Sequence, residues 1–309
     1  MHKRIGLVDV DSHNFPSLPL MKISAYHKAR GDAVEFVSLF EHYDIVYKSK
    51  VFDFTEDKYA NYNINADVIV TGGTGYKNST IFPNEIEHIY PDYNIYPKYS
   101  NTAYGFLTRG CPRNCEFCIV TKKEGKKSVQ VAEISEFWRN QKEIKLLDPN
   151  LLACTNHEKL LTDLAATNSY IDFTQGLDIR LITADIVHLL NKLKTKRLHF
   201  AWDNPKEDLT AQFTLFNKIS KLSSRNQKIV YVLTNFNSTI AEDLTRVEVL
   251  KNLGYDPYIM IYNKTNAPQE IKRLARWVNN RKIFRTIEKF ADYKATTPKY
   301  ERLDNLTLF

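Results

Sequence analysis

A repeating alternation of apolar and amphipathic segments constrains the fold of this chain more than any other feature. From about Tyr104 onward, six short apolar runs, each typical of a buried strand, are followed by a helix-like pattern or a polar segment. The expected strands are Tyr104–Thr108, Ile144–Leu147, Tyr170–Phe173, Arg197–Phe200, Ile229–Leu233 and Tyr258–Ile261. The expected helices are Val131–Asn140, His157–Thr167, Ala184–Leu193, Leu209–Ser220, Thr239–Leu253 and Pro268–Asn279. Such units predict parallel strands, and six of them predict an α/β protein with an open (βα)6 partial TIM barrel.

The first hundred residues carry a second, shorter α/β pattern. The expected strands are Arg4–Val10, Ala33–Val37 and Ala66–Thr71, with a helix over Leu18–Ala29. This pattern predicts a small Rossmann-like layer. The segment Thr80–Ser100 is rich in tyrosine and proline, and we expect an extended linker packed against the barrel. The predicted domains are a truncated Rossmann-like unit with its linker (1–100), the barrel (101–265), and a basic helix and tail (266–309).

Composition places the chain among ordinary globular proteins. Of its 309 residues, 43% are hydrophobic and 26% are charged. No stretch approaches the ~18 apolar residues that a membrane span needs, and Asp9 interrupts the start before a signal-peptide core could form. Four cysteines do not make a disulfide framework. We therefore expect a cytoplasmic protein without a membrane partner. Its net charge of +7 is compatible with a polyanionic partner.

Three of the four cysteines lie within eight residues. The segment Gly110–Cys118 has the spacing Cys-x3-Cys-x2-Cys, formed by Cys111, Cys115 and Cys118. Three thiolates on one short loop are able to hold a polynuclear metal centre. Because three protein ligands on a four-iron cubane leave one iron open, this spacing indicates a catalytic rather than a structural site.

Two alternatives stay open for these cysteines. One is a zinc knuckle completed by Cys154, although structural zinc sites favour two short cysteine pairs and Cys154 has no neighbouring partner. The other is a set of ordinary buried thiols, which the clustering of three cysteines disfavours.

The cysteine motif resembles the signature of the radical S-adenosylmethionine (SAM) superfamily. The resemblance covers about Asn101–Lys264 and implies a [4Fe–4S] cluster on Cys111, Cys115 and Cys118. In that superfamily the open iron binds the amino and carboxylate groups of SAM, and the reduced cluster cleaves SAM to a 5′-deoxyadenosyl radical. The resemblance also implies a reducing electron donor such as a flavodoxin or ferredoxin.

Polar residues follow every predicted strand, and such strand ends gather on one face of a parallel barrel. The resemblance places Phe117 beside the adenine of SAM. Asp148 stands where the family usually has Gly-Gly-Glu, so we expect its carboxylate to receive the amino group of SAM. Asp178 and Arg180 suit the ribose hydroxyls and the carboxylate of SAM. The further cofactor-binding candidates are Asn150, Gln175, Asp203 and Asn235.

Cys154 follows the second strand of the barrel, near the expected radical chemistry. One interpretation makes it a catalytic thiol that donates a hydrogen atom or carries a group. The other makes it a small buried hydrophobic residue, as lone cysteines commonly are.

A Rossmann-like layer before the barrel is similar, in shortened form, to the cobalamin-binding subclass of the superfamily. His13 follows the first strand, where an imidazole can ligate cobalt and Asp11 could orient it. Pro16 at an expected glycine and the short layer argue against a bound corrinoid, and Asp11 or Ser12 could instead cap a helix. The run Thr71–Gly75 is either a phosphate cradle or a tight loop.

The carboxy-terminal segment is strongly basic, with aromatic residues between the cations. The cations are Lys272, Arg273, Arg276, Arg281, Lys282, Arg285 and Lys289, and the aromatic residues are Trp277, Phe284 and Phe290. Such a segment either contacts nucleic acid or forms a helix with a solvated basic face. The leading hypothesis is a radical SAM enzyme that methylates, methylthiolates or rearranges a nucleotide or nucleic acid. The alternatives are a cobalamin-dependent radical SAM methyltransferase and a non-enzymatic, zinc-stabilised nucleic-acid-binding protein.

Overall fold

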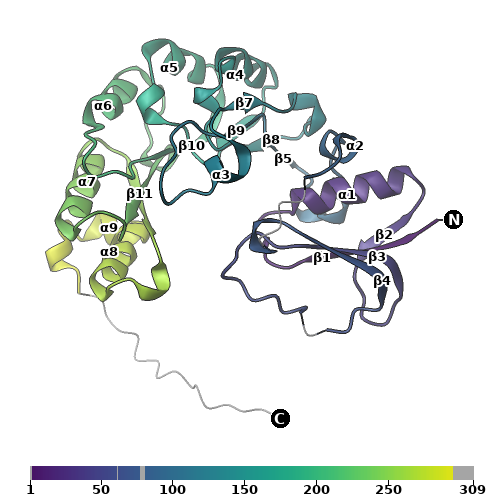
Figure 1. Cartoon of the computed structure of the whole chain (residues 1–309). Coiled ribbons are helices and arrows are strands. Elements are labelled where there is room, and N and C mark those ends of the chain that lie inside the picture. Colours follow the sequence, from purple (N-terminus) through teal and green to yellow (C-terminus); the bar gives the residue numbers. More distant parts are fainter. Residues whose placement is uncertain (1, 61, 77–80, 295–309) are drawn as a thin grey trace.

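The computed structural model describes residues 2–60, 62–76 and 81–294, which form two parallel β-sheets with helices (Figure 1). The first sheet has the order β2-β1-β3-β4, and all its strand pairs are parallel. Its strands are β1 (Arg4–Asp9), β2 (Ala33–Phe36), β3 (Tyr43–Ser49) and β4 (Ala66–Gly72). Helix α1 (Leu18–Ala29) packs on one face of this sheet through a cluster that includes Leu7, Leu20 and Ile23.

The second sheet contains six strands in chain order, and every neighbouring pair is parallel. The strands are β5 (Thr102–Gly105), β8 (Glu143–Leu146), β9 (Tyr170–Phe173), β10 (Lys194–Ala201), β11 (Lys228–Thr234) and β12 (Asp256–Ile261). The helices are α4 (His157–Ala166), α5 (Ala184–Leu190), α6 (Thr210–Ile219), α7 (Ile240–Asn252), α8 (Gln269–Asn279) and α9 (Arg281–Thr286). The helices form an outer arc around the strands (Figure 1). The α/β prediction with parallel strands is confirmed.

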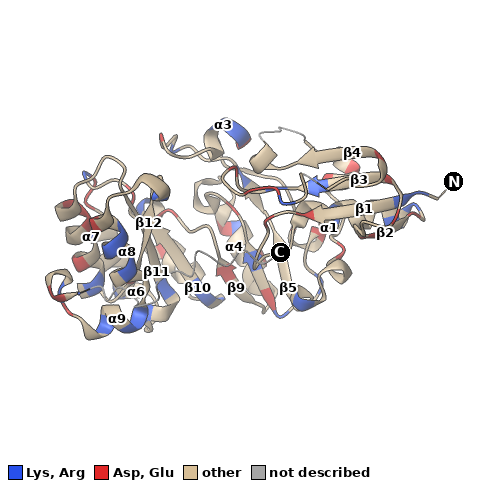
Figure 2. Ribbon diagram, turned by 90° about the horizontal axis from the view of Figure 1, so that it is seen from below, with Lys and Arg blue, Asp and Glu red and all other residues tan. Residues whose placement is uncertain are grey.

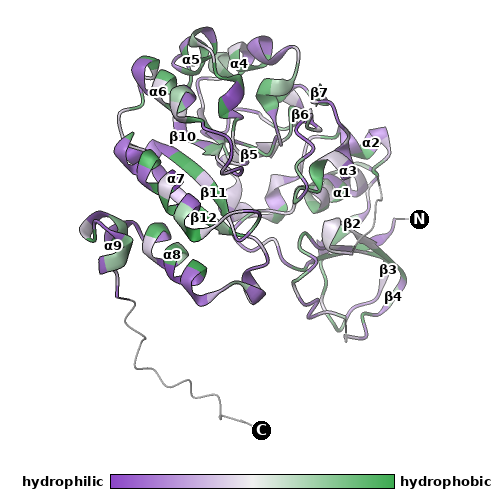
Figure 3. Cartoon of the chain, turned by 60° about the vertical axis from the view of Figure 1, so that its left-hand side comes forward, coloured by the Kyte–Doolittle hydropathy of each residue, from purple (hydrophilic) through white to green (hydrophobic). Residues whose placement is uncertain are grey.

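The main hydrophobic core lies between the six-stranded sheet and the arc of helices. Alternate strand residues such as Ile171, Phe173, Val230 and Val232 point into it and are almost fully buried. Figure 3 shows the hydrophobic residues of β11 next to α7. The opposite residues of each strand therefore belong to an inner face of the sheet, because side chains alternate along a strand. No helix in the described part of the chain is long and apolar enough to cross a membrane.

The predicted helix Val131–Asn140 is wrong. The segment contains only a 3-10 turn, Ile134–Glu136, in which Glu133 and Glu136 form a capping box. Phe137 turns into the core against Gly105, where an added Cβ would lie 2.3 Å from the Phe137 ring. Tertiary packing of this aromatic side chain thus prevails over local helix propensity.

The predicted strand Tyr104–Thr108 is divided in two. Strand β5 ends at Gly105, and β6 (Thr108–Arg109) pairs antiparallel with β7 (Val129–Gln130), which the sequence did not indicate. The cysteines follow β6 directly, and α3 (Val120–Glu124) comes after them. This small two-stranded ribbon closes the base of the cysteine loop.

The first layer differs from its prediction in two places. Strand β3 was missed, although it lies between β1 and β4; its polar residues hide the strand pattern, and one of them, Lys48, pairs with Asp57 at 2.7 Å. The segment Thr80–Ser100 is not an extended linker over its described part. It contains α2 (Asn84–Glu87) and the 3-10 turns Tyr93–Ile95 and Pro97–Tyr99.

These turns join the two sheets. Leu18 and Met21 of α1 form one buried cluster with Tyr93 and Tyr104. The Tyr93 hydroxyl donates to the carbonyl of Phe137 at 2.8 Å and accepts from the amide of Tyr104 at 2.9 Å. The first layer is therefore fixed to β5, next to the cysteine loop.

Candidate active site

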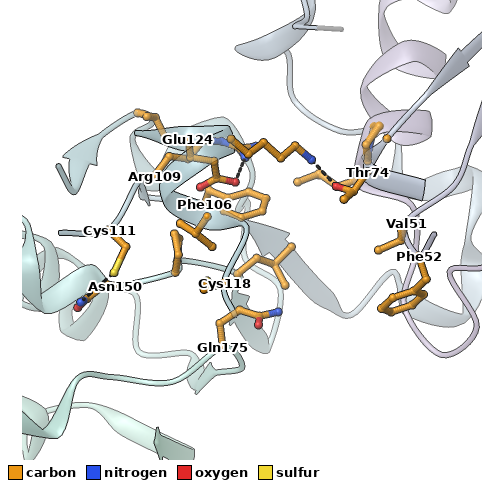
Figure 4. A pocket seen from close by; sticks show the side chains of 18 of the residues that line it. Val51, Phe52, Thr74, Phe106, Arg109, Cys111, Cys118, Glu124, Asn150 and Gln175 are labelled. Carbon is orange, nitrogen blue, oxygen red and sulfur yellow. Dashed lines mark hydrogen bonds and ion pairs between the residues drawn. The ribbon is translucent and has the colours of Figure 1, made fainter. Parts of the chain in front are cut away.

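A cavity of about 2390 Å³ lies between the loops of the first sheet and the carboxyl ends of β8, β9 and β10. The first layer contributes residues such as Lys50, Phe52 and Thr74 to its lining. Figure 4 shows Phe52 and Thr74 across the cavity from Cys111, Cys118, Asn150 and Gln175. The carboxyl ends of parallel strands are the usual ligand-binding edge of such sheets. Lys123 of α3 bridges to Thr74 with a hydrogen bond of 2.5 Å, so the cysteine loop and the first sheet meet at this cavity.

The backbone of the cysteine loop is fixed before any metal binds. Gly110 has a φ of +84°, and an added Cβ there would lie 2.1 Å from the carbonyl oxygen of Lys127, so only glycine fits. The amide of Cys111 donates to the carbonyl of Gly125, and the amide of Cys118 donates to the carbonyl of Cys115. Cys111, Cys115 and Cys118 are free, half-buried thiols, and all three line the cavity.

Cys154 does not belong to this group. It is 2% exposed, packs in the main core outside the cavity lining, and donates to Oδ1 of Asn156 at 2.9 Å. Both the zinc knuckle completed by Cys154 and the catalytic role of Cys154 are therefore wrong: it is a core thiol. In the described ranges, no three His, Cys, Asp or Glu side chains converge on a position for one metal ion.

The prediction for Asp148 is also wrong. Its side chain is buried, lies outside the lining of this cavity, and accepts hydrogen bonds from the amides of Leu107 and Thr108 and from the Thr108 hydroxyl. Burial raises the pKa of Asp148 to about 6, although these hydrogen bonds oppose the shift. Asp148 thus binds the segment between β5 and β6, through hydrogen bonds to both carboxylate oxygens, and does not reach the cavity.

Asn150 is the polar group that faces the cavity from the same loop. Its Nδ2 lies 3.6 Å from the Cys111 sulfur and 3.5 Å from Oδ2 of Asp178. The side chain is 3% exposed, and its Oδ1 atom has no hydrogen-bond partner. A buried carbonyl oxygen without a partner is costly, so this atom fits a donor group on a bound ligand.

Arg180 lines the cavity, but its guanidinium already pairs with two carboxylates. It donates to both oxygens of Glu207, at 2.9 and 2.6 Å, and to Oδ1 of Asp178 at 3.0 Å. Burial lowers the pKa of Arg180, but these bonds outweigh it, so the net shift is upward. Arg113, between the first two cysteines, lies 3.4 Å from Glu207 and 4.0 Å from Asp178.

These bonds use three of the five N–H donors of Arg180, so its predicted contact with a cofactor carboxylate stays a prediction. Sequence reasoning also missed Arg113 and Glu207. The only signal was their position, Arg113 within the cysteine segment and Glu207 a few residues after Trp202–Asn204 in the polar loop. The network connects the cysteine loop to the loops after β9 and β10.

Of the five remaining candidates, four line the cavity and one, Asn235, does not. Phe117, Gln175, Asp178 and Asp203 line the cavity, as expected of ligand-binding residues. Burial raises the pKa of Asp203 to about 6, with Arg180 opposing the shift.

Phe117 packs edge-on against Phe236, with ring centroids 5.4 Å apart. Asn235 is absent from the cavity lining, and its Nδ2 donates to the carbonyl of Tyr262 at 2.8 Å. The predicted ribose or substrate contact of Asn235 is therefore wrong.

The Asp-Ser-His segment does not form a ligand pair. Asp11 is buried and accepts from the amides of Val51 and Phe52 at 2.7 and 2.9 Å, whereas His13 is exposed and outside the cavity lining. Asp11 therefore stabilises a loop and does not orient His13. Gly73 (φ +101°) approaches the Lys50 carbonyl so closely that an added Cβ would lie 2.2 Å from it, which identifies Thr71–Gly75 as a tight loop beside the cavity.

The sequence matches no protein-family profile and no curated protein. The fold is similar to a solved structure of the radical S-adenosylmethionine methyltransferase TsrM from Kitasatospora setae with cobalamin and a [4Fe-4S] cluster bound. The TM-score is 0.62 at 10% identity, covering 84% of this chain and 75% of that one. TsrM with tryptophan substrate and a SAM analogue gives a TM-score of 0.41 at 12% identity, over 83% and 67% of the two chains. The first likeness shows that the chain shares the α/β fold of that protein, with its parallel sheets.

Proposed function

We propose that this chain is a radical SAM enzyme with an open (βα)6 partial barrel. The observation that carries the proposal is that Cys111, Cys115 and Cys118, from one loop, all line a cavity at the carboxyl ends of a parallel sheet. Their thiolates suit a polynuclear cluster, in which each ligand binds a different iron. The fold shared with a protein solved with such a cluster supports the proposal.

The chain's own residues would hold and orient the bound groups. When bound and reduced, the cluster supplies the electron that converts SAM to methionine and a 5′-deoxyadenosyl radical. Asn150 Oδ1, buried and unpartnered beside Cys111, accepts a hydrogen bond from the amino group of SAM. Phe117 gives an apolar surface for the adenine, and Asp178 and Asp203 are acceptors for its ribose hydroxyls.

The substrate class we propose is a nucleotide or nucleic acid, modified by methylation, methylthiolation or another C–H functionalisation. The basic composition of the chain supports this choice. A second candidate is cobalamin-dependent methyl transfer, since TsrM was solved with cobalamin and the cavity reaches Ser49 and Thr71–Thr74 of the first sheet. A corrinoid there would bind without His13, which lies outside the cavity lining.

Anaerobic reconstitution with iron and sulfide tests the proposal. Wild-type protein should bind about four irons and, with dithionite and SAM, release 5′-deoxyadenosine. Cys118→Ala should lose the cluster and the product, whereas the matched control Cys154→Ala should keep both, because Cys154 lies in the core. Protein that holds four irons but yields no 5′-deoxyadenosine, or that holds one zinc and no iron, would overturn the proposal.

Cobalamin is tested separately. Protein purified from corrinoid-fed cells should show corrinoid absorption if the second candidate is correct. Protein that lacks this absorption and still cleaves SAM would exclude cobalamin-dependent methyl transfer.

A further inference from the structure

The inner face of the six-stranded sheet is unusually open at its last strands. On β12, Ile259 is buried in the core, whereas Tyr258 and Met260, which point the other way, are 43% and 47% exposed. Tyr262, just beyond β12, is 44% exposed. Large apolar side chains in a continuous exposed row mark a binding surface more often than isolated ones do.

Aromatic rings connect this row to the cysteine loop. Tyr258 lies opposite Tyr231 in the sheet register, and their rings meet edge-on at 6.1 Å. Beyond the strand ends, the ring of Tyr262 contacts Phe236 at 4.9 Å, and Phe236 contacts Phe117 at 5.4 Å. Two ring contacts therefore link Tyr262, just beyond β12, to Phe117, the residue before Cys118.

Cations flank the same face. Arg197 of β10 is exposed and, within the described ranges, forms no ion pair. Burial lowers the pKa of His199, Asp172 opposes the shift, and Arg197 and Arg281 lie close enough to add to it. Arg281 pairs with Asp256, two residues before Tyr258 on β12, and Arg197 lies on β10, which pairs with the strand that carries Tyr231.

Asp172 lies opposite Arg197 in the sheet register and partly balances its charge, whereas the charge of the cations beside β12 is not balanced. Arg281 and Arg285 share one partner, Asp256, at 3.1 and 3.3 Å. Two guanidinium groups on one carboxylate leave a net positive charge. Figure 2 shows Lys and Arg on α8 and α9 next to β12. By contrast, Lys272 and Arg273 of α8 bind the carbonyls of Thr265 and Phe290, which makes them less available to a partner.

We propose that Arg197, Tyr231, Tyr258, Met260, Tyr262 and Arg281 form a binding surface for single-stranded nucleic acid, here called the inner-face surface. Exposed tyrosine rings stack on unpaired bases, and the arginines contact the phosphates. A base on Tyr262 or Phe236 would lie next to the cysteine loop. The inner-face surface adds a substrate-binding site to the proposed function. It rests on that function only for the reaction at the bound base, because RNA binding itself requires no catalysis.

Fluorescence anisotropy tests the surface. The probes are a fluorescein-labelled oligouridine RNA of about 16 nucleotides and its duplex with oligoadenosine. Reconstituted protein without reductant or SAM should prefer the single strand. Tyr258→Ala should weaken binding about fivefold or more without changing its salt dependence, because it removes stacking alone. Arg197→Gln should reduce the slope of log K against log salt by about 0.7, the value for one phosphate contact.

Matched controls come from the first layer. Tyr62, 50% exposed, and Arg30, also exposed, lie away from the inner-face surface, so Tyr62→Ala and Arg30→Gln should leave the affinity within about twofold. The inference is overturned if the RNA does not bind, if duplex and single strand bind equally, or if the two test variants behave like these controls. RNA binding without 5′-deoxyadenosine formation would overturn the proposed function alone. Formation of 5′-deoxyadenosine without RNA binding would overturn this inference alone.

Discussion

At the scale of single residues, Asp148 shows how one buried carboxylate shapes the site without lining it. It accepts from the amides of Leu107 and Thr108 and from the Thr108 hydroxyl, all within 3.2 Å. These bonds replace strand pairing where β5 ends and β6 begins. The cysteine loop follows two residues later, so Asp148 fixes the path by which the chain enters it.

We expect Asp148→Ala to destabilise the protein by about 3–4 kcal/mol at pH 4, because two amides and a hydroxyl lose their buried acceptor. Thr108→Val, which removes only the hydroxyl donor, should cost about 1 kcal/mol. Urea unfolding followed by circular dichroism measures both. Equal losses for the two variants would contradict the role given to Asp148.

The same carboxylate predicts a pH dependence. Burial raises the pKa of Asp148 from 3.8 to about 6, so the folded protein holds this proton over a range in which the unfolded chain has released it. The stability linked to the proton is complete below about pH 4 and is lost as the pH rises to about 6. The difference between wild type and Asp148→Ala should thus shrink by about 3 kcal/mol from pH 4 to pH 7. Unfolding curves across this range would refute the assignment if the difference stayed constant.

Residue positions were most predictable where one segment carries the signal. The three cysteines lie on one loop, and their common position at the cavity follows from their spacing after a strand. The partners of Asp148, Arg180 and Asn235 come from segments 41, 27 and 27 residues away, and no local pattern names them. Burial and pairing, which decide whether a polar residue is available to a ligand, are properties of the folded state.

At the scale of elements, α7 holds the loops that carry the site through a buried arginine. Arg246 pairs with Asp243 at 2.5 Å and donates to the carbonyls of Trp202 and Leu233. Both partners of the ion pair are almost fully buried. The helix is thereby joined to the ends of β10 and β11, from which Asp203 and Phe236 enter the cavity.

We expect Arg246→Leu to destabilise the protein by about 3–5 kcal/mol, because Asp243 is left buried and unpaired. The double variant Asp243→Asn with Arg246→Leu should recover part of that loss, since no isolated charge remains. A double-mutant cycle of unfolding free energies measures the coupling. Strictly additive losses would show that the pair does not act as a unit.

The repeating elements were the most predictable part of the fold. Their apolar periodicity places eight of the nine expected strands and six of the seven expected helices close to where the structure has them. Val131–Asn140 failed because Phe137 packs beneath Gly105, a contact that its local pattern does not contain. Strand β3 was missed because its alternation is broken by Lys48, whose partner Asp57 lies beyond the strand.

At the scale of the whole molecule, the two sheets share one buried cluster. Met21 of the first layer is fully buried against Tyr93 and Tyr104. The predicted boundary near residue 100 thus falls in a segment that packs on both sides. Such an interface couples the unfolding of the two layers.

We expect one unfolding transition in the wild type, seen identically by circular dichroism and by tryptophan fluorescence. Trp138, Trp202 and Trp277 all lie in the six-stranded part, so fluorescence reports only on that part. Met21→Ala should cost about 2–5 kcal/mol and separate the two signals, because the first layer loses its anchor. Met260→Ala, at an exposed position, should change stability by less than about 0.5 kcal/mol. Separate transitions already present in the wild type would rule out this coupling.

Strands β5 and β12 end the six-stranded sheet and do not pair with each other in the described structure. A closed β-barrel would admit only molecules that fit through its open end, or the terminus of a longer polymer. An open sheet, whose two edge strands do not pair with each other, has no such restriction. A long polymer can lie across it sideways and present an internal unit, far from either terminus, to the loop that carries the thiols.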